Sequence, residues 1–124
     1  MKMMFVPLRR AVDFKGRSRR AEYWQFVGFF YAVMICFYLA IALVRTLGLY
    51  GPDLFFTSMF GLAFLVLLLP LISVSMRRLH DTNRSGWLLL LNFIPMVGGI
   101  FLLVLSLLDG TKGSNAFGPD PKGR

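Results

Sequence analysis

The side chains best suited to chemistry lie in one polar stretch, residues 76–87, which reads MRRLHDTNRSGW. His80 is the natural candidate for a proton switch, because an imidazole titrates near neutral pH and the chain has one histidine. If a helix continues to Asp81, the side chains of Arg77 and Asp81 share one of its faces. The stretch also has a structural interpretation, in which Arg77 and Arg78 stop translocation and the polar residues after them form a turn. Both interpretations of His80 remain open.

A second polar stretch, residues 16–24, reads GRSRRAEYW. Guanidinium groups bind phosphates through two parallel hydrogen bonds, so arginines here suit lipid head groups. The carboxylate of Glu22 needs a partner in this basic segment, and Arg19 or the cations of the first stretch would supply one. We predict one polar cluster that binds head groups or a protein partner, formed by Arg17, Arg19, Arg20, Glu22, Arg77, Arg78, His80 and Asp81.

The residue types favour neither an enzyme nor a metal site. One histidine and the single Cys36 fall short of a ligand set for zinc. The chain has no G-x-S-x-G, H-E-x-x-H or P-loop motif. We therefore expect no metal, no cofactor and no catalytic residue. An enzyme that acts on lipid head groups through His80 and Asp81 is the least favoured alternative.

Three apolar stretches must position these polar residues: 24–44, 54–76 and 86–108. Each exceeds the ~20 residues that a helix needs to cross a bilayer, and none contains Asp, Glu, Lys, Arg or His. The 56% of hydrophobic residues stand in blocks rather than stripes, so a soluble bundle would expose too much apolar surface. The sequence predicts an all-α membrane protein with three transmembrane helices in a single domain, 1–124.

The net charge of +8 gathers at the ends of these stretches. Seven basic residues lie in 1–22 and three in 77–85, against one in 45–53. Because positive loops stay in the cytoplasm, we expect a multi-pass membrane protein with a cytoplasmic N-terminus. Anionic lipid head groups are the expected partners of this charge, and no nucleic acid is expected.

Residues 1–22 are typical of a basic segment at the membrane interface. Pro7 and Gly16 argue against one continuous helix there, and Ser18 is a candidate N-cap for the next helix. The tail, residues 109–124, is rich in Gly and Pro and is expected to be irregular.

Small residues recur every four positions in the first apolar stretch. Such a ridge permits close helix packing in lipid, so it predicts a tight contact with another span or with a second copy of the chain. The ridge consists of Gly28, Ala32, Cys36 and Ala40.

Proline and glycine complicate the other two stretches. Pro70 is expected to kink or weaken the second. In the third, Asn92, Pro95 and the glycines at 98–99 stand near the middle. We favour one kinked helix that crosses the membrane. The alternative is a re-entrant hairpin that turns at 95–99 and returns to the side that it entered. Each arm would then span only ~14 Å, about half of the hydrocarbon core.

The polar motifs also occur in a familiar order: GRSRRAEYW at 16–24, RRLHDTNRSGW at 77–87, Ile94-Pro95, and GTKGSNAFGPDP at 110–121. From about Phe14 onward the chain resembles the domain of unknown function 805 family, small bacterial inner-membrane proteins. The resemblance implies a plasma-membrane location and no known activity. In that family the tail has a basic residue where this chain has Ala116, which weakens any role for charge there. The positions that match the family pattern are Arg17, Arg20, Glu22, Tyr23, Trp24, Arg77, Arg78, His80, Asp81, Gly86, Asn115, Phe117, Gly118, Pro119 and Asp120.

The favoured hypothesis is a non-catalytic membrane protein that binds lipid head groups or organises an assembly, as a homo-oligomer or with a membrane-protein partner. The alternative is a small transporter or channel subunit, with helices broken at Pro70, Asn92 and Pro95 around a pathway. The spans carry no ionisable residue for such a pathway.

Overall fold

The computed structural model describes residues 5–124, and every regular element in this range is a helix. In chain order the elements are α1 (Val6–Arg9), α2 (Arg20–Thr46), α3 (Tyr50–Asp81), the 3₁₀ helix η2 (Gly86–Phe93) and α4 (Val97–Leu107). The predicted all-α class is confirmed. Expectations for residues 1–4 of the N-terminal segment lie outside the described residues.

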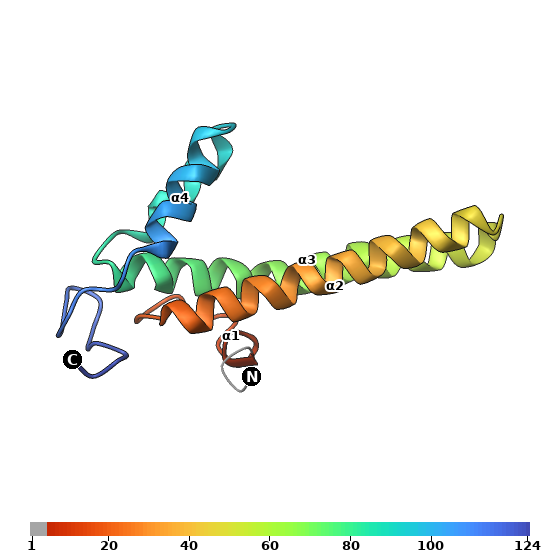
Figure 1. Ribbon diagram of the computed structural model, residues 1–124. Helices are drawn as coiled ribbons and strands as arrows, with labels where there is room; N and C mark the ends of the chain where they lie inside the picture. Colours follow the sequence, from red (N-terminus) through yellow and green to blue (C-terminus); the bar gives the residue numbers. More distant parts are fainter. Residues whose placement is uncertain (1–4) are drawn as a thin grey trace.

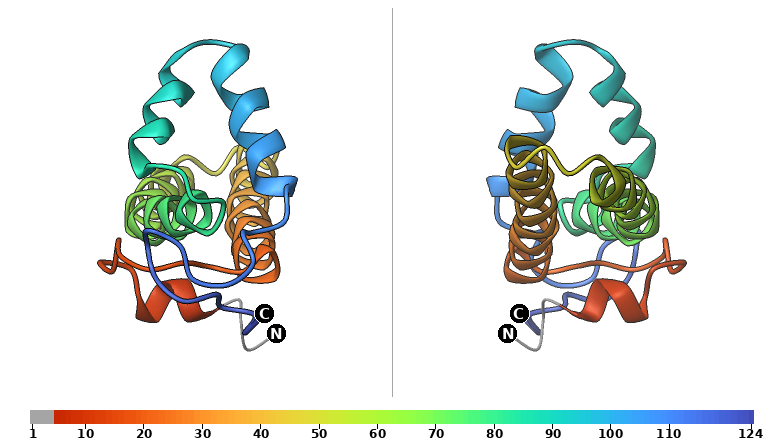
Figure 2. Two further views of the ribbon diagram at one scale, coloured as in Figure 1. Left: turned by 90° about the vertical axis from the view of Figure 1, so that its left-hand side faces the viewer. Right: turned by 90° about the vertical axis from the view of Figure 1, so that its right-hand side faces the viewer.

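The two long helices α2 and α3 lie antiparallel and side by side (Figures 1 and 2). They contain 27 and 32 residues, more than the ~20 needed to cross a bilayer. Only 17% of the most apolar 18-residue window of each helix is buried. Because most of their apolar surface faces outward, they are membrane-spanning helices, as the first two apolar stretches predicted.

One stripe of α2 contacts α3. Phe26, Phe30 and Met34 recur every four residues and are buried against Leu67 and Val74. Between helices in lipid, close van der Waals packing takes the place of the hydrophobic effect. These large side chains therefore hold the pair together.

The ridge of small residues lies on a different face of α2. Gly28, Ala32 and Cys36 are exposed, and Ala40 is half-buried. A side chain added at Gly28 would meet nothing within 4 Å. The ridge does not form the contact with α3, so its predicted contact with a second copy remains a prediction.

The connection between α2 and α3 is short and uses a glycine in the left-handed region. Gly48 has φ +70°, which glycine adopts without steric cost. Pro52 follows in the first turn of α3, where backbone N–H groups have no partner within the helix. Further along, α3 continues through the buried Pro70 as one helix.

The third apolar stretch does not cross as one helix, so the favoured prediction for 86–108 was wrong. η2 and α4 form a hairpin that turns at Ile94–Met96 and returns to the end of α3 where it began (Figure 1). The arms, of 8 and 11 residues, each extend only ~16 Å, about half of the ~30 Å hydrocarbon core. The structure confirms the re-entrant alternative.

Local chemistry explains the turn. Pro95 has no N–H to continue a helix, and Met96 has a positive φ of 65°. Where the arms meet, a Cβ on Gly98 would lie 1.5 Å from the carbonyl oxygen of Leu91. Only glycine permits this close approach of the two backbones.

Residues 5–19 pass beneath both long helices (Figure 2). The Ser73 hydroxyl of α3 donates to the carbonyls of Arg10 and Asp13, at 2.9 and 2.7 Å. The segment is not one helix, as predicted. The N-cap prediction was wrong by one residue: Arg19 is the N-cap, and the Ser18 hydroxyl instead donates to the carbonyl of Val74, 3.2 Å away.

Candidate functional site

Three segments meet where α2 begins and α3 ends, which we call the polar end. They are the residues before α2, the last turn of α3, and the tail after α4 (Figure 1). The backbone joins them directly: Ser18 N–H donates to the Arg77 carbonyl, and Thr111 N–H donates to the Asp81 carbonyl at 2.8 Å. The opposite end, at residues 47–49, we call the loop end.

Asp81 lies at the centre of the polar end. Its carboxylate accepts from Arg17 Nε at 2.9 Å and from Arg78 Nη1, and all three side chains are 1% exposed. A Cβ on Gly110 would lie 2.0 Å from the Asp81 carboxylate. The tail therefore packs so closely on this ion-pair group that only glycine fits at position 110.

The guanidinium of Arg17 holds the tail in place. It donates to the carbonyls of Thr111 and Gly113, the latter at 2.7 Å, and lies 3.9 Å from the carboxylate of Asp120. Since these contacts join residues almost 100 positions apart, Arg17 ties the start of the domain to its end.

Arg78 ties the returning arm of the hairpin to α3. Its guanidinium donates to the carbonyls of Ser106, at 3.3 Å, and Leu108. These carbonyls belong to the end of α4, where the last carbonyls of a helix have no partner within it. An arginine there satisfies these carbonyls, and the negative end of the helix dipole stabilises its positive charge.

Arg77 pairs with Glu22, which joins α3 to the first turn of α2. Arg77 Nη1 lies 2.9 Å from Glu22 Oε1, and the arginine side chain is fully buried. The structure thus identifies the partner that the sequence analysis sought for Glu22. Arg77 does not pair with Asp81, although α3 does extend to Asp81. Its Nε and Nη2 have no hydrogen-bond partner among the described residues.

His80 lies between the N-terminal segment and the tail. Its ring stacks on Phe117 with centroids 4.1 Å apart and planes at 1°, and its Nδ1 lies 3.1 Å from the Gly16 carbonyl. The side chain of Asn115 donates to the His80 carbonyl at 2.9 Å. His80 is buried, and these contacts join the end of α3 to both segments.

The buried arginines of the polar end are all paired with carboxylates. Arg17 and Arg78 pair with Asp81, and Arg77 pairs with Glu22. Buried arginine is tolerated when it is paired and hydrogen-bonded. None of the three is therefore a free cation for an external ligand.

The remaining arginines of the predicted cluster are more accessible. Arg19 is half-buried and donates to the Pro121 carbonyl from Nε at 2.7 Å. The Arg20 side chain is 46% exposed, 3.7 Å from Asp109. The structure brings all eight predicted residues to one end. Binding of an external group by any of them remains a prediction.

Three exposed basic residues belong to the segments that form the polar end, and we call them the basic rim: Lys15, Arg84 and Lys112. No carboxylate lies within 4 Å of these three cations in the described part of the chain. The sequence analysis did not select them, although Arg84 and Lys112 lie inside the motifs RRLHDTNRSGW and GTKGSNAFGPDP and Lys15 directly precedes GRSRRAEYW.

The end of the tail forms an ion-pair group of its own. Asp109 pairs with Lys122 and Arg124, at 2.6 and 2.9 Å, and Asp120 pairs with Arg124 at 2.9 Å. The Lys122 backbone N–H and then Arg124 lower the pKa of Asp120 to about 2. Hydrogen bonds from Lys122, Gly110 and Arg124 hold the pKa of Asp109 well below its usual range.

The sequence analysis missed the role of the tail. Gly110, Thr111, Asn115 and Phe117 contact the polar residues of α3, but residues 109–124 were expected only to be irregular. The available signal was the family-like motif GTKGSNAFGPDP at 110–121. It pointed to these positions without indicating their contacts.

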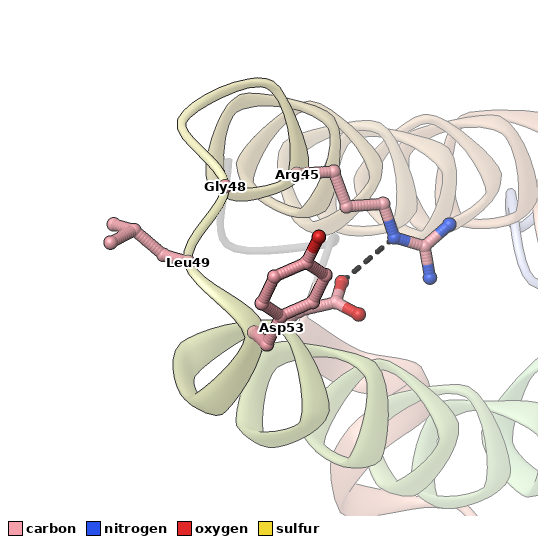
Figure 3. A pocket seen from close by; sticks show the side chains of 5 residues that line it. Arg45, Gly48, Leu49 and Asp53 are labelled. Carbon is pink, nitrogen blue, oxygen red and sulfur yellow. Dashed lines mark hydrogen bonds and ion pairs between the residues drawn. The ribbon is translucent and has the colours of Figure 1, made fainter.

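An apolar groove of about 660 Å³ lies between the α2/α3 pair and the hairpin. Tyr23 and Trp24, packed edge to face at 5.3 Å, line it near the polar end, and Asn92 lines it on η2. A smaller cavity of about 170 Å³ lies at the loop end, where Arg45 pairs with Asp53 at 2.8 Å (Figure 3). Among residues 5–124, no three potential metal ligands come together.

Comparison with known proteins gives a family but no activity. The family model described as "Protein of unknown function (DUF805)" matches residues 11–119. The chain is 41% identical over 118 residues to inner membrane protein YhaH of Escherichia coli K12, covering 93% of this chain and 92% of the relative. It is 44% identical over 115 residues to inner membrane protein YhaI of the same strain, covering 93% and 91%. No solved structure matches it.

Proposed function

Because this chain belongs to the DUF805 family of proteins of unknown function, with inner membrane proteins among its relatives, we propose that it is a non-catalytic inner-membrane protein that binds anionic phospholipid head groups at its polar end. The observation that carries this proposal is the sorting of charge there. Each buried arginine is paired with a carboxylate, whereas Lys15, Arg84 and Lys112 of the basic rim are exposed and lack a carboxylate partner.

The distribution of charge supports a cytoplasmic polar end. In the described part of the chain, Arg45 is the basic residue at the loop end, and the other basic residues lie toward the polar end. Positive segments remain on the cytoplasmic side during insertion. There, each Lys or Arg near an anionic surface contributes about 1 kcal/mol to binding.

Thiol labelling tests this orientation. A cysteine at Ala116 in a Cys36→Ser background is expected to resist a membrane-impermeant reagent in intact cells and to react after permeabilisation. A cysteine at Thr46, exposed near the loop end, is expected to react in intact cells. The reverse pattern would place the basic rim on the wrong side for the proposal.

The helix geometry supports binding rather than transport. The transporter alternative placed helix breaks at Pro70, Asn92 and Pro95. However, α3 is continuous at Pro70, Asn92 lies within η2, and the chain turns back at Pro95 to form the hairpin. Ionisable residues of a pathway are expected near the midplane. Those of α3 lie in its first turn and its last two turns.

Lipid enrichment tests the proposed binding. The purified protein is equilibrated with mixed phosphatidylglycerol and phosphatidylcholine vesicles, and retained lipids are counted by native mass spectrometry. We expect enrichment of phosphatidylglycerol that falls several-fold in a Lys15→Gln, Arg84→Gln, Lys112→Gln variant and declines with salt. Arg45→Gln, at the loop end, is the matched control. Equal retention of both lipids by the unmodified protein would refute the proposal.

A further inference from the structure

We infer that the groove between the α2/α3 pair and the hairpin holds an acyl chain of a bilayer phospholipid whose anionic head group contacts Arg20. This inference rests on the proposed function and deepens it, since it names the lipid class and a second part of its site. It makes the hairpin one wall of a lipid site.

The walls of the groove suit a hydrocarbon chain. Its volume of about 660 Å³ lies within the ~300–1,000 Å³ of ordinary ligand pockets. Tyr31 of α2, Leu68 and Ile72 of α3, and Leu103 of α4 line it. The groove therefore offers apolar contact from three helices at once.

Arg20, at the mouth of the groove, selects an anionic head group. Arg20 is one turn before Tyr23 and Trp24, which line the groove. Its Nη1 donates to the Leu107 carbonyl at 3.1 Å, beside the lining residue Ser106. With 46% of its side chain exposed, Arg20 keeps donors free for a phosphate. Tyr23 and Trp24 are also the residue types that concentrate at the head-group level.

A phospholipid suits the groove better than an apolar partner helix does, because the apolar walls lead to a cation, Arg20, at the mouth. A single acyl chain is far thinner and extends along the groove. The cation at the mouth then complements the phosphate.

Photolabelling tests the inference on the full-length protein in nanodiscs. The probe is a phosphatidylglycerol whose acyl chain carries a diazirine, and labelled peptides are mapped by mass spectrometry. Gly99 lines the groove, and a Cβ there meets nothing within 4 Å. Gly99→Phe is therefore expected to occupy the groove without a clash. We expect it to reduce labelling of the peptides that contain Tyr31 and Leu68 about tenfold.

A matched control makes the result specific. Gly61 is also helical and unobstructed but does not line the groove, so Gly61→Phe is expected to leave labelling unchanged.

The outcomes separate this inference from the proposed function. Loss of phosphatidylglycerol enrichment in the basic-rim variant, with groove labelling unchanged by Gly99→Phe, would retain the proposed function and overturn the groove site. Equal groove labelling by phosphatidylcholine and phosphatidylglycerol probes would also overturn it, because Arg20 would then select no head group. Weaker groove labelling in Arg20→Gln than in Arg45→Gln supports it.

Discussion

Each end of the α2/α3 pair has an Arg–Asp ion pair, which is exposed to solvent at the loop end and buried at the polar end. At the loop end, Arg45 Nε lies 2.8 Å from Asp53, and the side chains are 62% and 26% exposed. At the polar end, Arg17 lies 2.9 Å from Asp81, and both side chains are 1% exposed. The distances are nearly equal. Their energetic consequences differ, because exposed pairs contribute ~0–1 kcal/mol, whereas removing one partner of a buried pair costs ~3–5 kcal/mol.

The difference extends to what each end joins. Arg45 and Asp53 are eight residues apart and close a turn that the chain already forms locally. Arg17, Asp81 and the tail are brought together from distant parts of the sequence. The loop end therefore depends on local conformation, and the polar end depends on tertiary contacts.

Asp81→Asn should show the largest contrast between the ends. It removes the carboxylate shared by two buried guanidinium groups, so we expect a loss of ~3–5 kcal/mol in the free energy of unfolding. Asp53→Asn, its control, should cost less than ~1 kcal/mol. Denaturant unfolding in detergent, followed by circular dichroism, measures both. Equal losses would mean that burial does not distinguish the two pairs.

Glycine substitutions sharpen the contrast at a smaller magnitude. Gly48 needs its positive φ but has open space, so Gly48→Asn should be tolerated, since Asn adopts the left-handed region. Gly110 has no positive φ but touches Asp81, so even Gly110→Ala should cost ~1–3 kcal/mol through overpacking. The tryptic cleavage rate at Lys112, measured by mass spectrometry, should rise in the Gly110 variant alone. Faster cleavage in Gly48→Asn would contradict the comparison.

The loop end and the helix pair were accessible to sequence reasoning because their determinants are local. Blocks of apolar residues define α2 and α3, and the position of Arg45 at the end of a block marks the turn. The polar end was accessible only in part. Arginine and acidic residues showed that Arg17, Glu22 and Asp81 belong together, but the pairing of Arg77 with Glu22 rather than Asp81 depends on how the helices pack.

The hairpin shows where hydropathy alone fails. The stretch 86–108 is long and apolar enough for a crossing helix. It forms a hairpin instead because of Pro95, the positive φ of Met96 and the contact of Gly98 with Leu91. The tail was missed for a related reason. Its contacts are mostly hydrogen bonds to backbone carbonyls, such as that of Arg17 to Gly113, which leave no periodic pattern in a sequence.

Acid titration gives the smallest expected effect and tests whether the tail ion pairs contribute to docking at the polar end. The pKa of Asp120 is lowered to about 2, below its ordinary value of 3.8 in a released tail. The contribution of the Asp120 carboxylate to docking of the tail should therefore be complete above about pH 4 and should disappear as the pH falls toward about 2. The lowered pKa of Asp109 acts in the same direction. Fluorescence anisotropy of a label on Ala116→Cys, in a Cys36→Ser background, measures release of the tail.

Substitution of the tail cations makes this titration decisive. Lys122→Gln with Arg124→Gln removes side chains that lower both pKa values, so the midpoint of release should move upward, toward pH 4. Lys112→Gln is the control, since its exposed side chain lies in the tail but outside these ion pairs. An identical midpoint in all three proteins would show that the tail is held by its hydrogen bonds with Arg17 and α3 rather than by its own ion pairs. The contrast with the loop end would then depend entirely on the buried contacts of the polar end.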